Sequence, residues 1–531
     1  MSLQESSPAT APTPPADGGL ARAAAVGSGW TALQGIANKV ATMAAMYLVA
    51  RSLSPTEYGM ASLVLAAGGF LSIFPSFVMG DVIITHQRHA AVVVGIAASV
   101  VWRSAVLLSM GVAAAAPLVA WFYGQYPFVH LMTLLLVVAA RPIGEAAAVI
   151  PQSDLRISFR FRAIALIDGS VQLCATLLTV ILALTTHDAI SMVLPQVAGV
   201  LVRAACYGAV VRGVPRADRT QALYARRPQL RRAIRGRIRQ EFVLAALAQY
   251  VHTLISGLPV LVLGRVSTEE QTGLFGFAVV LANQVSYVLS QQLGAVLQPI
   301  FGRLKSDQPR QIAAFLRVVR MVSVIAVPAS LLQAALAVPL FRIFFDQRWE
   351  GAVPVFAVLC IGQAFFFAAA PAMALLKAQG RFGPYFGWQL VQLAFSLVAY
   401  PLVAAHGGAL GLSVLDSIVW SVSIPFAVWL AARGVGTSLS EVLRLFLAPW
   451  ALALPASLAL WKSWDMLPSQ GLLAASVWVF VAGSGAFVLC IYATRFTQPD
   501  AHAELSPYVM GATRRASRTL RALLRLGAVD Q

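Results

Sequence analysis

Charge is scarce in this sequence, since only 11% of its 531 residues are Asp, Glu, Lys or Arg while 59% are apolar. Soluble domains carry about a quarter charged residues, so the composition excludes an ordinary soluble domain. The mean hydropathy is +0.75. A helix needs about 20 apolar residues to cross a bilayer, and such segments recur from residue 27 to residue 495. The composition predicts an all-α, polytopic membrane protein.

Motifs for catalysis or metal binding are also missing. The four cysteines all lie in apolar segments without metal-ligand spacing, which favours a packing role. The sequence has no Walker loop, HExxH or GxSxG motif at a membrane boundary. Residues 1–26 lack the basic and apolar regions of a cleaved signal, and we expect them to form a disordered cytoplasmic tail. The sequence predicts neither an enzyme nor a bound cofactor or metal.

Apolar segments separated by charged or turn-rich stretches predict about 14 transmembrane helices. In chain order, the predicted spans are 28–50, 58–80, 92–122, 127–151, 163–186, 190–211, 242–264, 272–299, 318–342, 353–376, 384–405, 408–432, 445–463 and 471–494. With a cytoplasmic amino terminus, five of the 39 Lys and Arg residues fall on the outer side and four within spans, which leaves 30 on the cytoplasmic side. Lys and Arg set orientation, so both termini are predicted to be cytoplasmic.

A short repeat divides the spans into two halves. The chain reads RSLSPTEYG after the first span and RVSTEEQTG after the seventh, so that Arg51 and Gly59 match Arg265 and Gly273. Parallel repeats of this kind are a known transporter plan, with the substrate site between the halves. The repeat predicts two pseudo-symmetric bundles. The predicted parts are an amino-terminal bundle over 27–211, a linker over 212–240, a carboxy-terminal bundle over 241–432, two further spans over 433–494 and a basic cytoplasmic tail over 495–531.

The linker contains QALYARRPQLRRAIRGRIRQ, with seven arginines and no acid in residues 221–240. In a soluble protein this would indicate nucleic-acid binding. Between two membrane bundles, the same charge fixes topology and attracts anionic lipids of the inner leaflet, at about 1 kcal/mol per residue near the surface. We therefore predict a lipid contact and no nucleic-acid partner.

Ionisable residues inside spans are costly, and they mark paired or functional positions. Four are cations and three are acids: Lys39, Arg103, Arg141, Arg203, Glu145, Asp168 and Asp416. The four cations would make a cavity in the amino-terminal half positive, which favours an anionic substrate group such as phosphate. Alternatives stay open. Arg141 and Glu145 can form an ion pair one helical turn apart or a gate, and Arg103 and Arg203 can reach inner-leaflet phosphates.

The acids suggest a second role. Asp168 and Asp416 can carry a coupling ion, H⁺ or Na⁺, because desolvation favours proton uptake by a carboxylate. For Asp168, a carboxylate satisfied by a neighbouring arginine or hydroxyl is an equal alternative. Asp416 has no other charge in the core of its half, which favours a function. Glu145, Asp168 and Asp416 are the predicted residues for gating or ion coupling.

Four stretches resemble the bacterial polysaccharide flippases of the multidrug, oligosaccharidyl-lipid and polysaccharide exporter superfamily. They are YLVARSLSPTEYGMASLVLAAGGFLSIF, IPQSDLRISFRFRAIALID, VLGRVSTEEQTGLFGFAVVLANQVSYVLSQQLGAVLQPIFGRL and FFDQRWEGAVPVFAVLCIGQAFFFAAAPAMALLKAQGR. The resemblance implies two bundles in a V, which translocate an undecaprenyl-diphosphate-linked glycan across the bacterial inner membrane. It also implies a cationic cavity, here Lys39, Arg103, Arg141 and Arg203. Many relatives have an aspartate where this chain has Gly257 and Pro259, which argues against ion coupling there.

This resemblance predicts that the protein is a flippase for a lipid-linked polysaccharide repeat unit, which serves exopolysaccharide, capsule or O-antigen export. Polysaccharide polymerase and glycosyltransferases are the expected protein partners. Three alternatives are kept: a peptidoglycan-precursor flippase, a cation-coupled multidrug exporter and a membrane scaffold that does not transport. The clustered arginines argue against cationic drugs as substrates.

Overall fold

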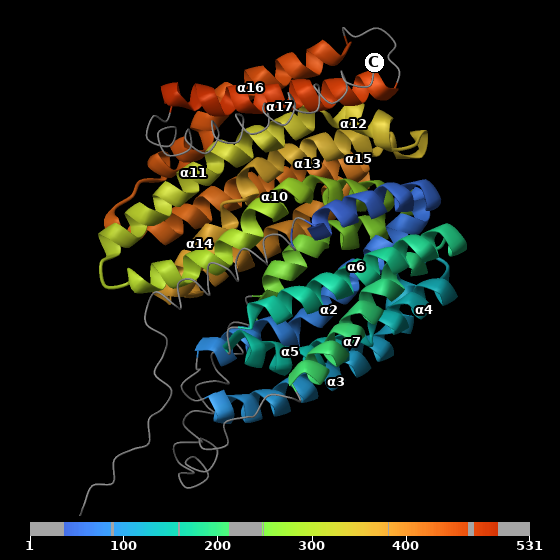
Figure 1. Cartoon of the computed structure of the whole chain (residues 1–531). Coiled ribbons are helices and arrows are strands. Elements are labelled where there is room, and N and C mark those ends of the chain that lie inside the picture. Colours follow the sequence, from blue (N-terminus) through green and yellow to red (C-terminus); the bar gives the residue numbers. More distant parts are fainter. Residues whose placement is uncertain are drawn as a thin grey trace, which may run out of the picture.

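The computed structural model describes residues 35, 37–85, 90–157, 160–211, 247, 249–380, 382–465 and 472–497. Within these ranges the chain is helical and contains no strand (Figure 1). The predicted amino-terminal tail, the predicted linker and residues 498–531 of the predicted carboxy-terminal tail lie outside the described residues. The all-α prediction is confirmed for the described part.

The first half starts with a helix over residues 37–52. It continues with α2 (Pro55–Thr85), α3 (Ala90–Phe122), α4 (Phe128–Val138), α5 (Arg141–Ile157), α6 (Phe161–Thr186) and α7 (Ile190–Val211). The second half starts with a helix over residues 249–266. Then follow α10 (Glu269–Arg303), α11 (Gln308–Ala335), α12 (Ala337–Phe344), α13 (Ala352–Phe366), α14 (Ala369–Gln379), α15 (Phe382–Ala432), α16 (Leu439–Asp465) and α17 (Leu472–Thr497).

The predicted spans fall mainly on one helix or on two consecutive helices. The predicted boundary between the eleventh and twelfth spans lies inside α15, where Gly408 has φ 53° and ψ −146° and interrupts the helix. Only glycine adopts such a conformation readily. In the described part, nine helices are long and apolar enough to cross a membrane. The number of crossings and the side of the termini stay predictions.

Two predicted spans are each broken near the middle. The fourth span is divided into α4 and α5 at residues 139–140, and the tenth into α13 and α14 at residues 367–368. Pro142 and Pro371 follow these breaks, and proline cannot donate the hydrogen bond that would continue the preceding helix. The fourth and tenth predicted spans therefore each contain a turn near the middle of one apolar stretch, Phe128–Leu155 and Ala352–Gln379 respectively. Because the fourth and tenth spans occupy equivalent positions, both halves share the break.

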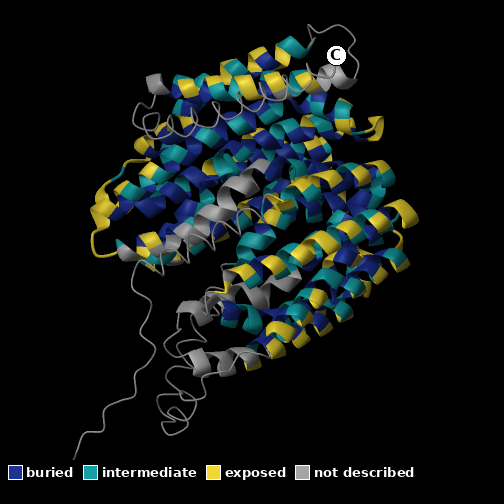
Figure 2. Cartoon of the chain, in the orientation of Figure 1, coloured by how far each residue is buried: buried dark blue, intermediate teal, exposed yellow. Residues whose placement is uncertain are grey.

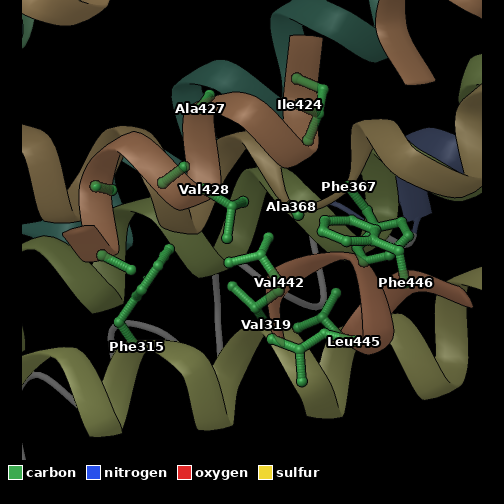
Figure 3. Close-up of a cluster of buried hydrophobic side chains, with 14 of the residues drawn as sticks. Phe315, Val319, Phe367, Ala368, Ile424, Ala427, Val428, Val442, Leu445 and Phe446 are labelled. Carbon is green, nitrogen blue, oxygen red and sulfur yellow. The ribbon is translucent and has the colours of Figure 1, made fainter. Parts of the chain in front are cut away.

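The helices of each half pack mainly on one another (Figure 1). A large apolar cluster joins α11, α14, α15 and α16, with Phe315, Val319, Phe367 and Phe446 among its buried members (Figure 3). Exposed residues lie on the outward faces of the helices (Figure 2). On α6 these include Leu177 and Ile181, which are 54% and 57% exposed. Such apolar outward faces suit contact with lipid.

The connections predicted to lie outside the membrane meet at one end of the helices, near α4 and α12 in Figure 1. The backbone N–H of Ala189 donates to Glu57 Oε2 at 3.1 Å, and His130 Nε2 lies 2.9 Å from Asp188 Oδ1. Contacts also join the two halves here, because Trp349 Nε1 donates to the Ala50 carbonyl at 2.8 Å. We call this end of the molecule the outer end, on the predicted orientation.

Candidate functional site

The break in the fourth span places Arg141 at the start of α5. The apolar stretch around it runs from Phe128 to Leu155, so Arg141 lies near its middle. Close packing fixes α5 against α7, because a Cβ on Gly144 would lie 2.7 Å from Val200 Cγ1. In the first turn of α5, Pro142 has no N–H, and the Gly144 N–H donates to the Ala140 carbonyl of the preceding turn at 3.4 Å. Interrupted helices in equivalent positions of two halves indicate a transporter binding site.

Glu145 joins two arginines from neighbouring helices. Arg203 Nη2 on α7 donates to Glu145 Oε2 at 2.6 Å, while Arg141 Nε lies 3.9 Å from Glu145 Oε1. The side chains are 15% to 28% exposed. Among the described side chains, the Nε atoms of Arg141 and Arg203 are buried without a hydrogen-bond partner. One carboxylate shared by two guanidinium groups leaves unused N–H donors, which suit an anion with several oxygens.

Asp168 has a tyrosine partner in the same half. The Tyr207 hydroxyl on α7 donates to Asp168 Oδ1 at 2.7 Å, and Gln152 Nε2 donates to the Tyr207 oxygen at 3.3 Å. The polar group therefore extends over α5, α6 and α7. A carboxylate satisfied by a hydroxyl was one of the two predicted alternatives for Asp168, and this hydrogen bond matches it. Ion coupling at Asp168 stays a prediction.

Lys39 lies at a separate place, beside a long apolar cavity. Its Nζ donates to Gln284 Oε1 of α10 at 2.7 Å. The cavity has a volume of about 1040 Å³. The helix over residues 37–52 lines it with Lys39, Tyr47 and four apolar residues, and further lining residues come from α10, α11, α12, α13 and α17. A nearly apolar cavity with one ammonium group suits a lipid chain that ends in an anionic group.

Asp416 is buried in the other half, with 8% of its surface exposed. The Tyr400 hydroxyl donates to Asp416 Oδ1 at 2.7 Å. Both residues belong to α15, on opposite sides of the Gly408 interruption. Each half therefore holds one aspartate–tyrosine hydrogen bond between its fifth and sixth predicted spans. A buried carboxylate with a neutral donor can take up or release a proton.

The structure separates the four predicted cavity cations. It brings Arg141 and Arg203 together through Glu145 and places Lys39 beside the apolar cavity. Arg103 is an exposed residue of α3, a position that also allows contact with lipid phosphates. The sequence analysis missed Tyr207, Tyr400 and Gln284 as partners. Their polar side chains inside apolar spans were the available signal, since such groups need hydrogen-bond partners in a membrane.

Comparison with known sequences gives one family and several distant relatives. A family model described as polysaccharide biosynthesis protein matches residues 48–354. The succinoglycan biosynthesis transport protein ExoT of Rhizobium meliloti (strain 1021) is 23% identical, over 80% of this chain and 83% of the relative. The lipopolysaccharide biosynthesis protein WzxC of Escherichia coli (strain K12) is 22% identical, over 62% of this chain and 64% of the relative.

Comparison with solved structures shows the fold. The lipid II flippase MurJ in an inward closed conformation aligns with a TM-score of 0.65 at 9% identity, over 89% of this chain and 98% of that chain. An inward-facing multidrug resistance transporter of the MATE family aligns with a TM-score of 0.51 at 12% identity, over 77% of this chain and 99% of that chain. The arrangement of helices is therefore that of polytopic transporters with two bundles.

Proposed function

Because this chain belongs to the family of polysaccharide biosynthesis proteins, we propose that it is a flippase for a lipid-linked polysaccharide repeat unit. It is a multi-pass protein of the bacterial inner membrane and a transporter rather than an enzyme. Its cargo would be an undecaprenyl-diphosphate-linked glycan, moved to the outer leaflet by alternating access. The product would serve exopolysaccharide, capsule or O-antigen export. The relative named as a succinoglycan transport protein, which spans most of this chain, supports this proposal.

The observation that carries the proposal is the pair of arginines at the break between α4 and α5. A diphosphate has several anionic oxygens, which match the planar donors of guanidinium groups. Arg141 and Arg203 have buried Nε donors without hydrogen-bond partners among the described side chains. Glu145 holds Arg203 in place. These groups would bind the diphosphate.

The apolar cavity beside Lys39 would hold part of the polyprenyl chain. Its lining is formed by Leu, Ile, Ala, Met and Phe side chains, with few polar atoms. Burial of apolar area stabilises a complex by about 25 cal/mol per Å² when the area was exposed to water. A polyprenyl chain moves into the cavity from lipid, so this gain is absent. Its binding would depend on how well its shape fits the cavity. Lys39 lies beside the cavity, where its ammonium group would meet the anionic end of the lipid.

Two aspartates inside the predicted spans, the half-buried Asp168 and the buried Asp416, would give the proposed transport an energy source. Asp168 and Asp416 each accept a hydrogen bond from a tyrosine hydroxyl, in the amino- and carboxy-terminal halves respectively. Uptake of H⁺ or Na⁺ by either carboxylate would change its bond to the tyrosine. Such a change can shift the balance between two packings of a bundle, provided that the ion binds one packing better. Coupling at these aspartates is part of the proposal.

The alternatives have less support. A multidrug exporter of cationic drugs would need acids available to the drug, whereas Glu145 is shared by Arg141 and Arg203 and Asp168 accepts a hydrogen bond from Tyr207. The likeness to a lipid II flippase concerns the fold alone, because the identity is 9%. A scaffold that assembles polymerase and glycosyltransferases would not need unpartnered guanidinium donors. Those enzymes and anionic inner-leaflet lipids remain proposed partners of the flippase.

Deletion of the gene tests the proposed function. The deletion strain should lose secreted or surface polysaccharide and accumulate lipid-linked repeat units that face the cytoplasm. A plasmid copy should restore export, and a copy with Arg141→Ala should not. Normal export in the deletion strain would reject the proposal, and loss of viability would favour the peptidoglycan-precursor alternative.

A further inference from the structure

The repeat that divides the sequence marks the point where the two halves touch most closely. α2 and α10 each start with a hydroxyl residue at the N-cap. Ser54 Oγ accepts a hydrogen bond from the Glu57 N–H at 3.2 Å, and Thr268 Oγ1 accepts one from the Gln271 N–H at 3.2 Å. The two caps are 214 positions apart, as are Arg51 and Arg265. The repeat therefore builds the same helix start twice.

Gly59 and Gly273, the glycines of the repeat, face each other across these two helix starts. A Cβ on Gly59 would lie 2.2 Å from the carbonyl oxygen of Glu269, and a Cβ on Gly273 would lie 1.8 Å from the carbonyl oxygen of Pro55. Pro55 and Glu269 are again 214 positions apart. The contact is reciprocal, as at a two-fold axis, where each residue meets the equivalent of its own neighbour.

Backbone thus lies directly on backbone at this contact, and no other residue type fits there. Approaches under 3.0 Å to a main-chain oxygen cannot be relieved by turning a side chain. One turn deeper, a Cβ on Gly276 would lie 2.5 Å from Ser62 Oγ, so α2 and α10 stay close along a second layer. Other glycines of the same helices differ: Gly69 on α2 and Gly302 on α10 have nothing within 4 Å of a built Cβ. Among the described glycines of α2 and α10, those with a close approach between the two helices lie at the outer end.

Further hydrogen bonds close the same end. The Tyr123 hydroxyl donates to the Leu261 carbonyl at 3.1 Å, and Gln125 Nε2 donates to the Gly264 carbonyl. Arg348 Nη2 donates to the Arg51 carbonyl at 2.9 Å. Each of these bonds joins the first half to the second, so the outer end is shut. A transporter with alternating access must separate its halves at this end to release cargo outward.

We propose that the reciprocal contact between Gly59 and Gly273 is the outer gate, and that the two glycines are needed for α2 and α10 to close it. This inference rests on the proposed transport function and adds the place where the pathway shuts. The added methyl group of Gly59→Ala or Gly273→Ala would hold the helix starts apart. Overpacking costs about 1–3 kcal/mol, and about 1.4 kcal/mol corresponds to a tenfold change in population.

Cysteine labelling in whole cells tests the gate. The reporter is Ser62→Cys, just inside the contact, in a chain whose four native cysteines are replaced by alanine. A membrane-impermeant maleimide added outside should label the reporter about tenfold faster when Gly59→Ala or Gly273→Ala is present. Gly69→Ala and Gly302→Ala are the matched controls on the same helices, and they should leave the labelling rate unchanged. If a gate variant fails to accumulate, Gly264→Ala provides a milder change between the halves, because its added Cβ would meet the Leu63 side chain of α2, with Cδ1 at 2.8 Å.

Three results would overturn the proposal. They are an unchanged labelling rate in gate variants that accumulate normally, an equal increase in the control variants, and labelling of the reporter only from the cytoplasmic side. The labelling rate needs no substrate. A chain that fails to flip any glycan but still shows the predicted labelling would reject the proposed function and leave the gate standing.

Discussion

Arg141 and Arg203 are expected to fail in different ways when each is replaced by alanine. Arg203 holds Glu145 through a 2.6 Å hydrogen bond, whereas Arg141 Nε is 3.9 Å from the same carboxylate. Breaking a buried ion pair costs about 3–5 kcal/mol, and an exposed pair contributes about 0.2–1 kcal/mol. The Arg203 and Glu145 side chains are 28% and 15% exposed. We therefore expect Arg203→Ala to lower the free energy of unfolding by about 2 kcal/mol.

Arg141→Ala should lower that free energy by less than about 1 kcal/mol and should mainly reduce flipping. A hydrogen bond to a charged group contributes about 1.5–3 kcal/mol, so loss of one diphosphate contact should slow flipping by about tenfold to a hundredfold. Thermal unfolding in detergent measures the first effect, and flipping in liposomes the second. Arg433→Ala, an exposed change outside both sites, is the control.

A double variant sharpens this test. In Arg203→Ala the Glu145 carboxylate is left without its hydrogen-bond partner, so adding Glu145→Gln should recover part of the lost stability. The same Glu145→Gln change alone should destabilise, because it leaves two guanidinium groups close together. We distinguish Arg203, which stabilises the fold through Glu145, from Arg141, which would bind the diphosphate. Equal destabilisation by Arg141→Ala and Arg203→Ala would refute this distinction.

The remaining predictions concern the cavity, the coupling acid and the outer gate. Ala329→Trp should fill part of the apolar cavity and reduce flipping in liposomes without changing the melting temperature; unchanged flipping would separate this cavity from transport. Asp416→Asn should abolish the dependence of flipping on an ion gradient, while Tyr400→Phe should only alter it; a gradient response that persists in Asp416→Asn would exclude coupling there. In the closed structure, burial raises the pKa of the Glu269 carboxyl, and the negative charge of Glu57 raises it further. Protonation of Glu269 therefore favours the closed gate. Closure should weaken as the outer pH rises above the ordinary value of 4.5. Reporter labelling should then rise with pH more steeply than in the Glu269→Gln chain, where only the ionisation of the reporter thiol changes the rate.

The sequence predicted the helices well because each apolar segment is bounded by charge or turn residues. Even the interruption at Gly408 coincided with a predicted boundary. The turns at residues 139–140 and 367–368 were not placed as span boundaries, because both lie inside continuous apolar stretches. Pro142 and Pro371 were the local signals, because proline has no N–H to donate the hydrogen bond that would continue the preceding helix.

The candidate site was predicted only in part. Spacing on one helix predicted the pair of Arg141 and Glu145, but the shorter bond from Arg203 depends on how α5 packs against α7. Likewise, no spacing rule joins Lys39 to Gln284, which is 245 positions away. The repeated glycines were visible in the sequence, whereas their contact requires the pseudo-two-fold arrangement of the halves.

Reconstitution with a defined substrate tests the central claim most directly. Purified protein in liposomes would be given a polyprenyl-diphosphate-linked oligosaccharide, and its movement between leaflets would be followed by enzymatic access to the sugar. We predict movement that exceeds the rate in protein-free liposomes and that falls by about tenfold or more with Arg141→Ala. Movement at the protein-free rate, or equal movement by Arg141→Ala, would contradict the account.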